Sequence, residues 1–475
     1  MAVIIALAQV YPGFLMTSMP LPVRASAPTP LVARSIALPV AEVTPLLHLL
    51  PAAEASDLFS WVRRGEGMVG WGRVASSTAY GEKRFATLRR WWEAVSAAAV
   101  VRDEVGVPGS GPVAFGSFAY AASSPAGATL VVPEVIVGRR GDRAWLTTLS
   151  VGPELPAAGG LDAVLGGRPG RQAGGRATEA ARGEAHPGAE AHPGEAAPER
   201  PRDVTFADGA SSPAQWAGAV ARAVELITAG ELDKVVLARD LEVRSGGALD
   251  VRWLLERLAE RYDATWVFSV DGLVGATPEM LVRSEKGLVT SRVLAGTIRR
   301  TGNDEHDLAL AGSLARSSKD LEEHEYAVRS VADALRPHCS SMNVPETPFV
   351  LHLANVMHLA SDVAGVLVDG ASSLALAEAL HPSAAVCGTP TARADEVVAE
   401  LEAMDRGRYA GPVGWIDASG DGEWGIALRC GAFDPMDASR MRLYAGCGIV
   451  AGSDPEAEVA ESDAKLVPMR DALTA

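Results

Sequence analysis

The sequence LYAGCGIVAGSDPEAEVAESDAKL, residues 443–466, joins a glycine-spaced segment with strand character directly to a carboxylate-bearing helix. Asp454 and Pro455 predict where that helix begins, because an aspartate at the N-cap accepts hydrogen bonds from unpaired helix amides and proline has no amide to leave unpaired. The apolar positions available for packing are Val459, Ala460, Ala464 and Leu466. The stretch therefore predicts a strand followed closely by a helix with one apolar side.

Acidic and basic side chains share another stripe of this helix. At 3.6 residues per turn, Glu458, Glu461 and Lys465 fall on one side. Two carboxylates one turn apart suit a hard divalent cation. The alternative is a solvated stripe in which Glu461 and Lys465 form an ordinary surface pair. The sequence of this helix alone does not distinguish a cation site from a surface pair, so the rest of the chain has to be considered.

Composition and charge limit the class of protein. The chain has 475 residues, of which 48% are hydrophobic, enough for one large core or for two or three domains. Its net charge of −16 argues against a nucleic-acid or anionic-membrane partner, since both need a basic surface, but allows a small anionic substrate in a positive pocket.

Four widely spaced cysteines form neither a disulfide framework nor a zinc pattern, and no apolar run approaches about 20 residues. We expect a cytoplasmic protein without a membrane span.

Composition divides the chain into four parts. Residues 1–32 predict a loose N-terminus, and residues 33–165 a β-rich part interrupted by one helical pattern. Residues 166–201 are dominated by Gly, Ala, Pro, Glu and Arg, which predicts a disordered insertion. Residues 202–475 interleave helical and strand patterns, which indicates an α+β unit with large antiparallel sheets.

Local patterns in the last part give specific expectations. Gly296 and Thr297 are expected in a turn, and residues 313–338 in one long helix. Glu279 follows Pro278 at a turn that enters a strand. Arg429 is expected at the end of the second strand of a hairpin.

Lysine is scarce in this chain. Of 43 basic residues only five are lysines, namely Lys83, Lys234, Lys286, Lys319 and Lys465. Where arginine is used nearly everywhere, a retained lysine is a candidate for a position that needs an amine able to lose its proton. Lys234 opens the apolar strand KVVLAR, so it is either a device that protects a sheet edge or a buried amine.

Nine motifs together resemble those of the chorismate-utilising enzymes. They are KVVLAR, GATPEML, LAGTIRR, KDLEEHE, VMHLAS, HPSAAVCGTP, RYAGPVGW, ALRC and AGCGIV, which appear in the family's order between Lys234 and the helix ending EAEVAESDAK. Each motif is weak alone, but the ordered set is specific and spans roughly half of the chain. The resemblance implies one α+β domain in which two large antiparallel sheets pack between helices and the N-terminal part contributes to the fold.

The resemblance also implies a site. Mg²⁺ would be bound by Glu323 and Glu461, with Glu458 supporting the ion directly or through water, and would neutralise the ring carboxylate of chorismate. The enolpyruvyl carboxylate would be held by Arg429 and Tyr409. Catalytic or substrate-binding positions carried over in the same way are Lys234, Glu279, His358, Gly296, Thr297, Ala385, Val386, Gly446, Gly448 and Lys465.

Three positions narrow the expected activity. Lys234 matches the lysine with which some members activate water for attack at C2, whereas the ammonia-using anthranilate synthases resemble glutamine there. Ala295 replaces the lysine that aminodeoxychorismate synthases carry before Gly-Thr. The loop HPSAAVCGTP looks like the isochorismate synthase version, although Ser383 stands where threonine is expected. These residues imply isochorismate synthesis, feeding menaquinone or siderophore formation.

Rival activities remain open at this point. The salicylate synthases share Lys234 and Glu279 but also expel pyruvate, so they are the nearest alternative. A non-catalytic chorismate-binding subunit would need an acid or base residue to be missing, and none is. The implied reaction uses neutral Lys234 as base and Glu279, with a pKa raised by burial, as acid. We expect chorismate as the substrate, no glutaminase partner and a monomer.

Overall fold

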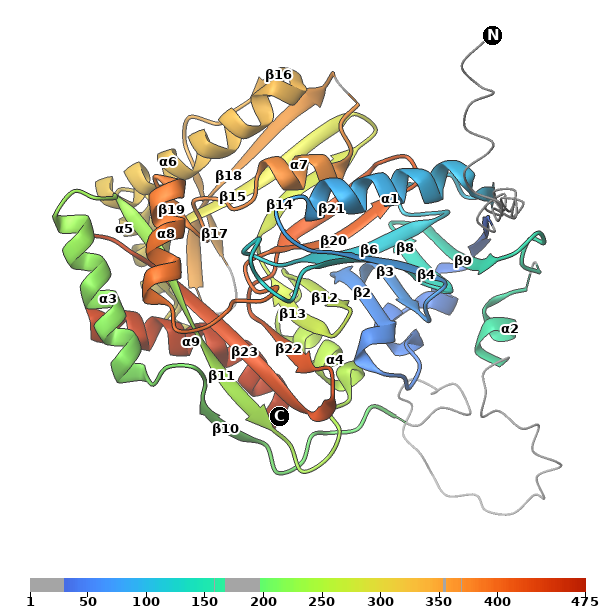
Figure 1. Ribbon diagram of the computed structural model, residues 1–475, viewed down its shortest axis with the longest axis horizontal. Helices are drawn as coiled ribbons and strands as arrows, with labels where there is room; N and C mark the ends of the chain where they lie inside the picture. The colour runs from blue at the N-terminus through green and yellow to red at the C-terminus, as the bar shows by residue number, and fades with distance from the viewer. Residues whose placement is uncertain (1–29, 158, 167–196, 353–355, 369) are drawn as a thin grey trace, which may run out of the picture.

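Two large β-sheets organise the chain, and helices cover their outer faces (Figure 1). The computed structural model describes residues 30–157, 159–166, 197–352, 356–368 and 370–475. Within these residues only β1 and β5 pair in parallel, and the other ladders are antiparallel. The expected α+β architecture with two large antiparallel sheets is confirmed.

The larger sheet combines strands from the whole length of the chain. Its order is β10 (Thr205–Asp208), β11 (Lys234–Arg244), β23 (Asp437–Ile449), β22 (Cys430–Asp434), β13 (Leu273–Thr277), β12 (Trp266–Val270), β2 (Leu58–Arg63), β3 (Glu66–Trp71), β8 (Val135–Arg140), β9 (Arg143–Val151), β1 (Leu31–Leu38) and β5 (Val100–Asp103), with β19 (Gly388–Thr389) also paired to β11.

The second sheet is built in the same mixed way. Its order is β16 (Cys339–Asn343), β18 (Val356–Leu367), β15 (Leu288–Arg299), β14 (Met280–Glu285), β21 (Gly422–Ile426), β20 (Pro412–Asp417), β6 (Val113–Phe118), β7 (Ala128–Val132) and β4 (Ala75–Ala79), with β17 (Phe349–His352) paired to β18. In each sheet, N-terminal strands continue the row of C-terminal strands, through the pairs β2–β12 and β6–β20. The N-terminal part is therefore integral to the fold.

Nine helices within the described residues flank the sheets. They are α1 (Arg84–Ala98), α2 (Leu161–Gly166), α3 (Pro213–Thr228), α4 (Val251–Arg261), α5 (Asp304–Leu314), α6 (Ser318–Leu335), α7 (Ser373–Ala379), α8 (Thr391–Leu401) and α9 (Pro455–Thr474). Helix α6 packs on β15 and β18, while α9 packs on β23 beside α3 and α4. None of the helices in the described parts of the chain combines the length and apolar composition that a bilayer crossing requires.

Helix α9 begins where the sequence predicts. Asp454 is its N-cap and accepts a hydrogen bond from the Ala457 amide at 2.9 Å, and Pro455 occupies the first helical position. The buried side is formed by Ser462, Leu466 and residues further along the helix, whereas Ala460 is exposed. Ser462 lies inside because its hydroxyl accepts a hydrogen bond from Arg239 Nε at 2.8 Å.

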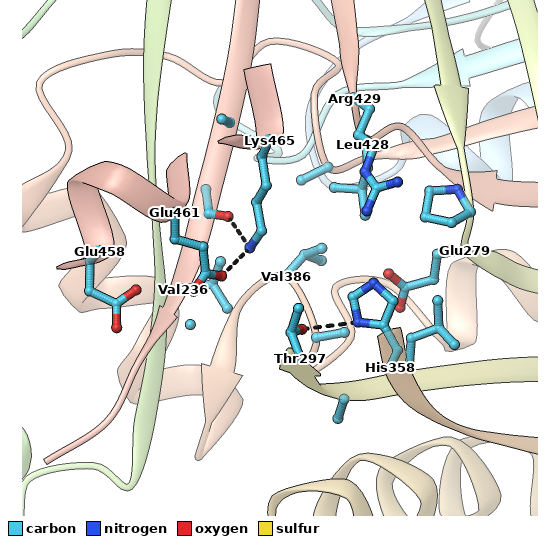
Figure 2. Close-up of a pocket in the computed structure, with 18 of the residues that line it drawn as sticks. Val236, Glu279, Thr297, His358, Val386, Leu428, Arg429, Glu458, Glu461 and Lys465 are labelled. Atoms are coloured by element: carbon cyan, nitrogen blue, oxygen red, sulfur yellow. Dashed lines mark hydrogen bonds and ion pairs between the residues drawn. The ribbon is translucent and has the colours of Figure 1, made fainter. Parts of the chain in front are cut away.

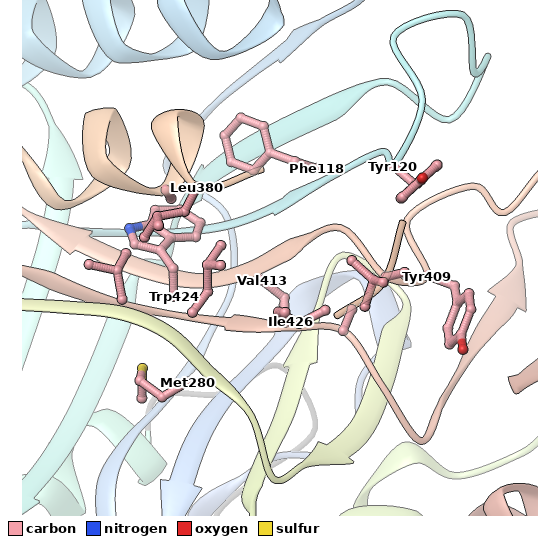
Figure 3. Close-up of a cluster of buried hydrophobic side chains, with 14 of the residues drawn as sticks. Phe118, Tyr120, Met280, Leu380, Tyr409, Val413, Trp424 and Ile426 are labelled. Carbon is pink, nitrogen blue, oxygen red and sulfur yellow. The ribbon is translucent and has the colours of Figure 1, made fainter. Parts of the chain in front are cut away.

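The main apolar core fills the space between the sheets. Figure 3 shows part of this core. The side chains of Phe118, Val413, Trp424 and Ile426 lie close together there and come from strands β6, β20 and β21 of the second sheet. A second core lies between the larger sheet and helices α4 and α9. Both cores are continuous across the N- and C-terminal parts, so neither part buries its apolar surface alone.

Three local expectations were wrong. The predicted helix over residues 313–338 is interrupted, because α5 ends at Leu314 and Ser317 caps a new helix, α6. Gly296 and Thr297 do not form a turn but lie inside β15 at a β-bulge. Arg429 does not end a hairpin strand: β21 stops at Ile426, and Arg429 sits before β22 with a φ of 48°.

Two predicted boundaries also differ from the structure. Strand β1 begins at Leu31, inside the segment assigned to a loose N-terminus. The insertion predicted over residues 166–201 lies mostly outside the described residues, but its last residues are attached to the fold: the Glu199 amide donates to Asp250 and Arg200 donates to the Thr474 carbonyl.

Candidate active site

One cavity of about 250 Å³ collects most of the residues that the sequence singled out. It lies where β11 and β23 of the larger sheet face β15 and β18 of the second sheet, and α9 and the loop before α8 complete its wall. The predicted residues that line it are Lys234, Glu279, Gly296, Thr297, His358, Ala385, Val386, Tyr409, Arg429, Gly446, Gly448, Glu458, Glu461 and Lys465.

Lys234 reaches the cavity across a glycine. It begins β11, and Gly448 lies opposite Val236 on the adjacent strand β23. A Cβ atom on Gly448 would stand 2.9 Å from Lys234 Cε. Only glycine at this position therefore leaves space for the lysine side chain in its observed place.

The bulge in β15 brings Thr297 and His358 together. Gly296, with a φ of 73°, is the extra residue between Ala295 and Thr297, and Thr297 then pairs with His358 on β18. The Thr297 hydroxyl and His358 Nδ1 are 2.9 Å apart, as Figure 2 shows. The bulge changes the side on which residues project, and so directs a hydroxyl toward the imidazole.

His358 and Arg429 each present a buried nitrogen to the cavity. His358 Nε2 and Arg429 Nη1 have no hydrogen-bond partner among the described residues. Burial, together with the charges of Arg429 and Lys465, lowers the pKa of His358 to about 3, so its imidazole is neutral near pH 7. Burial also lowers the pKa of Arg429, although a guanidinium stays charged. Such donors suit an anionic ligand with oxygen acceptors.

Glu279 is a buried carboxyl group in the cavity wall. It follows β13, is 7% exposed and lies beside His358 in Figure 2. Burial raises the pKa of its carboxyl to about 7, and the nearby charges of Lys234, Lys465 and Arg429 limit the rise. The direction is the one predicted from burial, and it leaves a protonated carboxylic acid available near neutral pH.

Two tyrosines form another wall. Tyr409 is buried, and its ring stacks on that of Tyr444 with centroids 5.3 Å apart. A Cβ atom on Gly446 would come within 3.0 Å of the Tyr409 hydroxyl. Burial raises the pKa of Tyr409, so the phenol keeps its proton and can donate a hydrogen bond.

Helix α9 places carboxylates at one end of the cavity. One ligand atom each of Glu458, Glu461 and Cys447 lies within 4.8 Å of the other two. Burial and the neighbouring charge of Glu461 raise the pKa of Glu458. Burial raises the pKa of Cys447 to about 12, so this side chain is a thiol. Two carboxylates whose like charges repel each other fit a hard divalent cation. The protonated sulfur of Cys447, in contrast, is a poor ligand for Mg²⁺.

Lys465 lies between these carboxylates and the rest of the cavity. Its ammonium group is 2.8 Å from Glu461 and donates to the Gly446 carbonyl at 2.9 Å (Figure 2). Burial disfavours the charge, but the Glu461 carboxylate outweighs burial, and the pKa of Lys465 is raised. Lys465 therefore supplies a fixed positive charge beside the carboxylates.

The side chain of one predicted ligand is outside the described residues, and three ionisable residues that line the cavity were not predicted. Glu323 belongs to α6, but its side chain is outside the part of the chain that the structure describes. Asp320, Arg406 and Tyr444 also line the cavity. Arg406 stands two residues before the motif RYAGPVGW and three before Tyr409, and this proximity is the one sequence signal that marks it.

Known proteins share this sequence and fold. Residues 25–474 match the family described as chorismate binding enzyme. The salicylate biosynthesis isochorismate synthase of Pseudomonas aeruginosa is 31% identical over 433 residues, which are 87% of this chain and 84% of that protein. An isochorismate synthase of Bacillus subtilis is 39% identical over 273 residues, or 55% of this chain and 68% of that protein.

Solved structures agree on the fold. The menaquinone-specific isochorismate synthase from Escherichia coli superposes with a TM-score of 0.73 at 23% identity, over 94% of this chain and 95% of that chain. At this identity the likeness concerns the fold, and the family match along nearly the whole sequence identifies the relationship. The chain belongs to the chorismate-binding enzyme family.

Proposed function

We propose that this protein is a Mg²⁺-dependent isochorismate synthase. The observation that carries the proposal is that Lys234 and Glu279 line one cavity, where Glu279 has a pKa raised to about 7. An amine and a protonated carboxylic acid together can remove one proton and supply another, as an exchange of hydroxyl positions requires. Relatives named isochorismate synthase support this choice.

The reaction moves a hydroxyl group from C4 to C2 of the ring. The Lys234 amine accepts a proton from a water molecule whose oxygen bonds to C2, the ring double bond shifts, and the C4–oxygen bond breaks. Glu279 gives its proton to the departing C4 hydroxyl, which leaves as water. One water enters and one leaves, so chorismate and isochorismate are isomers and the reaction is reversible.

The two carboxylates of chorismate match the charges in the cavity. Arg429, with its buried Nη1 group, and the Tyr409 hydroxyl would hold the enolpyruvyl carboxylate. Lys465 lies beside the position assigned to the ring carboxylate. His358, neutral and bonded to Thr297, offers Nε2 to the ring hydroxyl region. These contacts orient the ring between base and acid.

The carboxylates on α9 would hold the metal ion. Glu458 and Glu461, with Glu323 from α6, are the hard oxygen donors that Mg²⁺ prefers. When bound, Mg²⁺ would supply positive charge that neutralises the ring carboxylate. Lys465 would hold Glu461 in place from the other side.

The related activities are disfavoured at particular positions. Ala295 precedes Gly296 and offers no nucleophile, which argues against covalent attack of the aminodeoxychorismate synthase kind. Lys234, in place of glutamine, argues against use of ammonia. Salicylate formation uses the same first step, so it is distinguished by product.

Product analysis tests the proposal. The full chain is incubated with chorismate and Mg²⁺ and the products are resolved by chromatography. Isochorismate as the main product, in equilibrium with chorismate, is expected. Salicylate and pyruvate as main products would move the protein to the salicylate synthases, and anthranilate formed from added ammonia would refute the assignment.

A further inference from the structure

We propose that Arg406 is a positioning residue that fixes the strand carrying Lys234 to the loop that forms the substrate wall. The inference rests on the proposed function, since it concerns the alignment of the base used there. Arg406 is 3% exposed and forms part of the cavity wall, close to Tyr120 and Tyr409 of the core shown in Figure 3. Its position follows from α8, which ends at Leu401 just before the segment that carries it.

The guanidinium connects two chain segments that are far apart in sequence. Arg406 Nη1 donates to the Val386 carbonyl at 2.8 Å, and Nη2 donates to the Val236 carbonyl at 2.7 Å. Val386 lines the substrate cavity, and Val236 is two residues from Lys234 on β11. One rigid planar group therefore sets the spacing between the base and the substrate wall.

Glu402 completes the connection. Its carboxylate accepts from Arg406 Nε at 2.8 Å and from Arg406 Nη2 at 2.5 Å. The same carboxylate accepts a hydrogen bond from the Ala238 amide at 2.7 Å, so β11 is held at a carbonyl and at an amide. Burial disfavours the charge of Arg406, but Glu402 outweighs it and raises the arginine pKa. The guanidinium therefore stays charged although both side chains are buried.

Few other bonds define the alignment of the loop and the strand. The Val236 amide donates to the Cys387 carbonyl at 2.8 Å, and the two-residue strand β19 pairs with Lys234 and Val235. A ladder this short does not by itself fix register, because each slip costs only a few hydrogen bonds. The Arg406 guanidinium adds a side-chain link between the Val386 carbonyl and the Val236 carbonyl, two residues along β11 from Lys234.

The ion pair of Arg406 and Glu402 contributes more to the geometry of the site than to the stability of the fold. A buried ion pair is weak support for stability, since removing two charges from water offsets most of their attraction. An apolar replacement of both partners leaves no unpaired charge, although the Val236 and Val386 carbonyls and the Ala238 amide then lose a hydrogen-bond partner. Lysine at position 406 keeps the ion pair but cannot reproduce the planar fork.

The test compares three variants with wild type in the full chain. They are Arg406→Lys, the double variant Arg406→Met with Glu402→Met, and the control Arg408→Lys. Arg408 is two residues away and bonds Asp271 and Ser117 at 2.9 Å and 3.0 Å, without lining the cavity. Steady-state kinetics with chorismate and thermal unfolding are measured for each.

We expect kcat to fall at least about tenfold in both Arg406 variants while KM changes less than about threefold, because a displaced base costs rate rather than binding. Arg406→Lys should melt close to wild type, the double variant should melt lower because it leaves buried backbone groups without a partner, and Arg408→Lys should match wild type in both kinetic constants. Wild-type kcat in Arg406→Lys would overturn the proposal. An increase in KM alone would also overturn it, because Arg406 would then be a substrate contact. A loss of kcat that follows the melting temperature across all variants would overturn it as well, because the effect would then be one of stability.

Hydrogen exchange separates this inference from the proposed function. Without substrate, amides of residues 234–238 and 383–389 should exchange faster in both Arg406 variants than in Arg408→Lys. If wild type forms no isochorismate, the proposed function fails, but the exchange result still decides whether Arg406 fastens the two segments. Unchanged exchange in both segments would refute the connection itself.

Discussion

Replacing Glu279 by glutamine should change how stability depends on pH. The pKa of Glu279 is raised from 4.5 to about 7 by burial, so the native state holds this proton more tightly than the unfolded chain does. The stabilisation is fully present below the unfolded pKa of 4.5 and is lost as pH rises through about 7. Glutamine has the same shape but cannot ionise, so Glu279→Gln removes this dependence.

The magnitude follows from the two pKa values. Linkage with an unfolded pKa of 4.5 and a folded pKa of about 7 gives roughly 2.5 kcal/mol between pH 5 and pH 8. Over that interval, wild type should lose about 2.5 kcal/mol of unfolding free energy relative to Glu279→Gln. Other titrating groups contribute equally to both proteins and cancel in the comparison.

Urea denaturation followed by tryptophan fluorescence at several pH values measures the difference. The two proteins should share one m-value, so that the separation of midpoints reports stability. Curves for wild type and Glu279→Gln that stay parallel from pH 5 to pH 8 would refute the reasoning. The carboxyl would then be ionised at neutral pH and could not act as the acid.

Three further outcomes are expected at the site. Lys234→Ala should lower turnover by about 10²- to 10⁴-fold with chorismate binding retained, and activity above roughly a hundredth of wild type would exclude it as the base. Glu461→Gln should weaken Mg²⁺ binding at least about tenfold by isothermal titration, whereas the exposed Glu456→Gln on the same helix should not; equal affinities would remove Glu461 from the metal site. Arg429→Gln should raise KM roughly 10- to 100-fold through loss of a charge-assisted bond, and an unchanged KM would contradict its role.

Local signals in the sequence were enough for much of the fold. Asp454 and Pro455 start α9 because capping depends on neighbouring residues alone. The ordered motifs led to the two-sheet architecture, which the topology confirms. The break before α6 was also readable, since Ser317 accepts from the Asp320 amide at the spacing of an N-cap, but the apolar periodicity concealed it.

Other features depend on contacts between distant segments. The bulge at Gly296 is defined by its partner strand β18, so the glycine alone suggested a turn. Arg406 bonds Val236, 170 residues earlier in the chain, and no local pattern marks such a bond. The roles assigned to the individual site residues, and Mg²⁺ itself, remain predictions that the experiments above address.

The place of β23 in the larger sheet bears on how the protein is made. This strand, residues Asp437–Ile449, lies between β11 and β22, although it is the last strand of the chain. Until β23 has left the ribosome, the facing edges of β11 and β22 stay unpaired and are available to strands of other chains. The larger sheet therefore cannot be completed before residues 437–449 have been synthesised, although its other strands precede them.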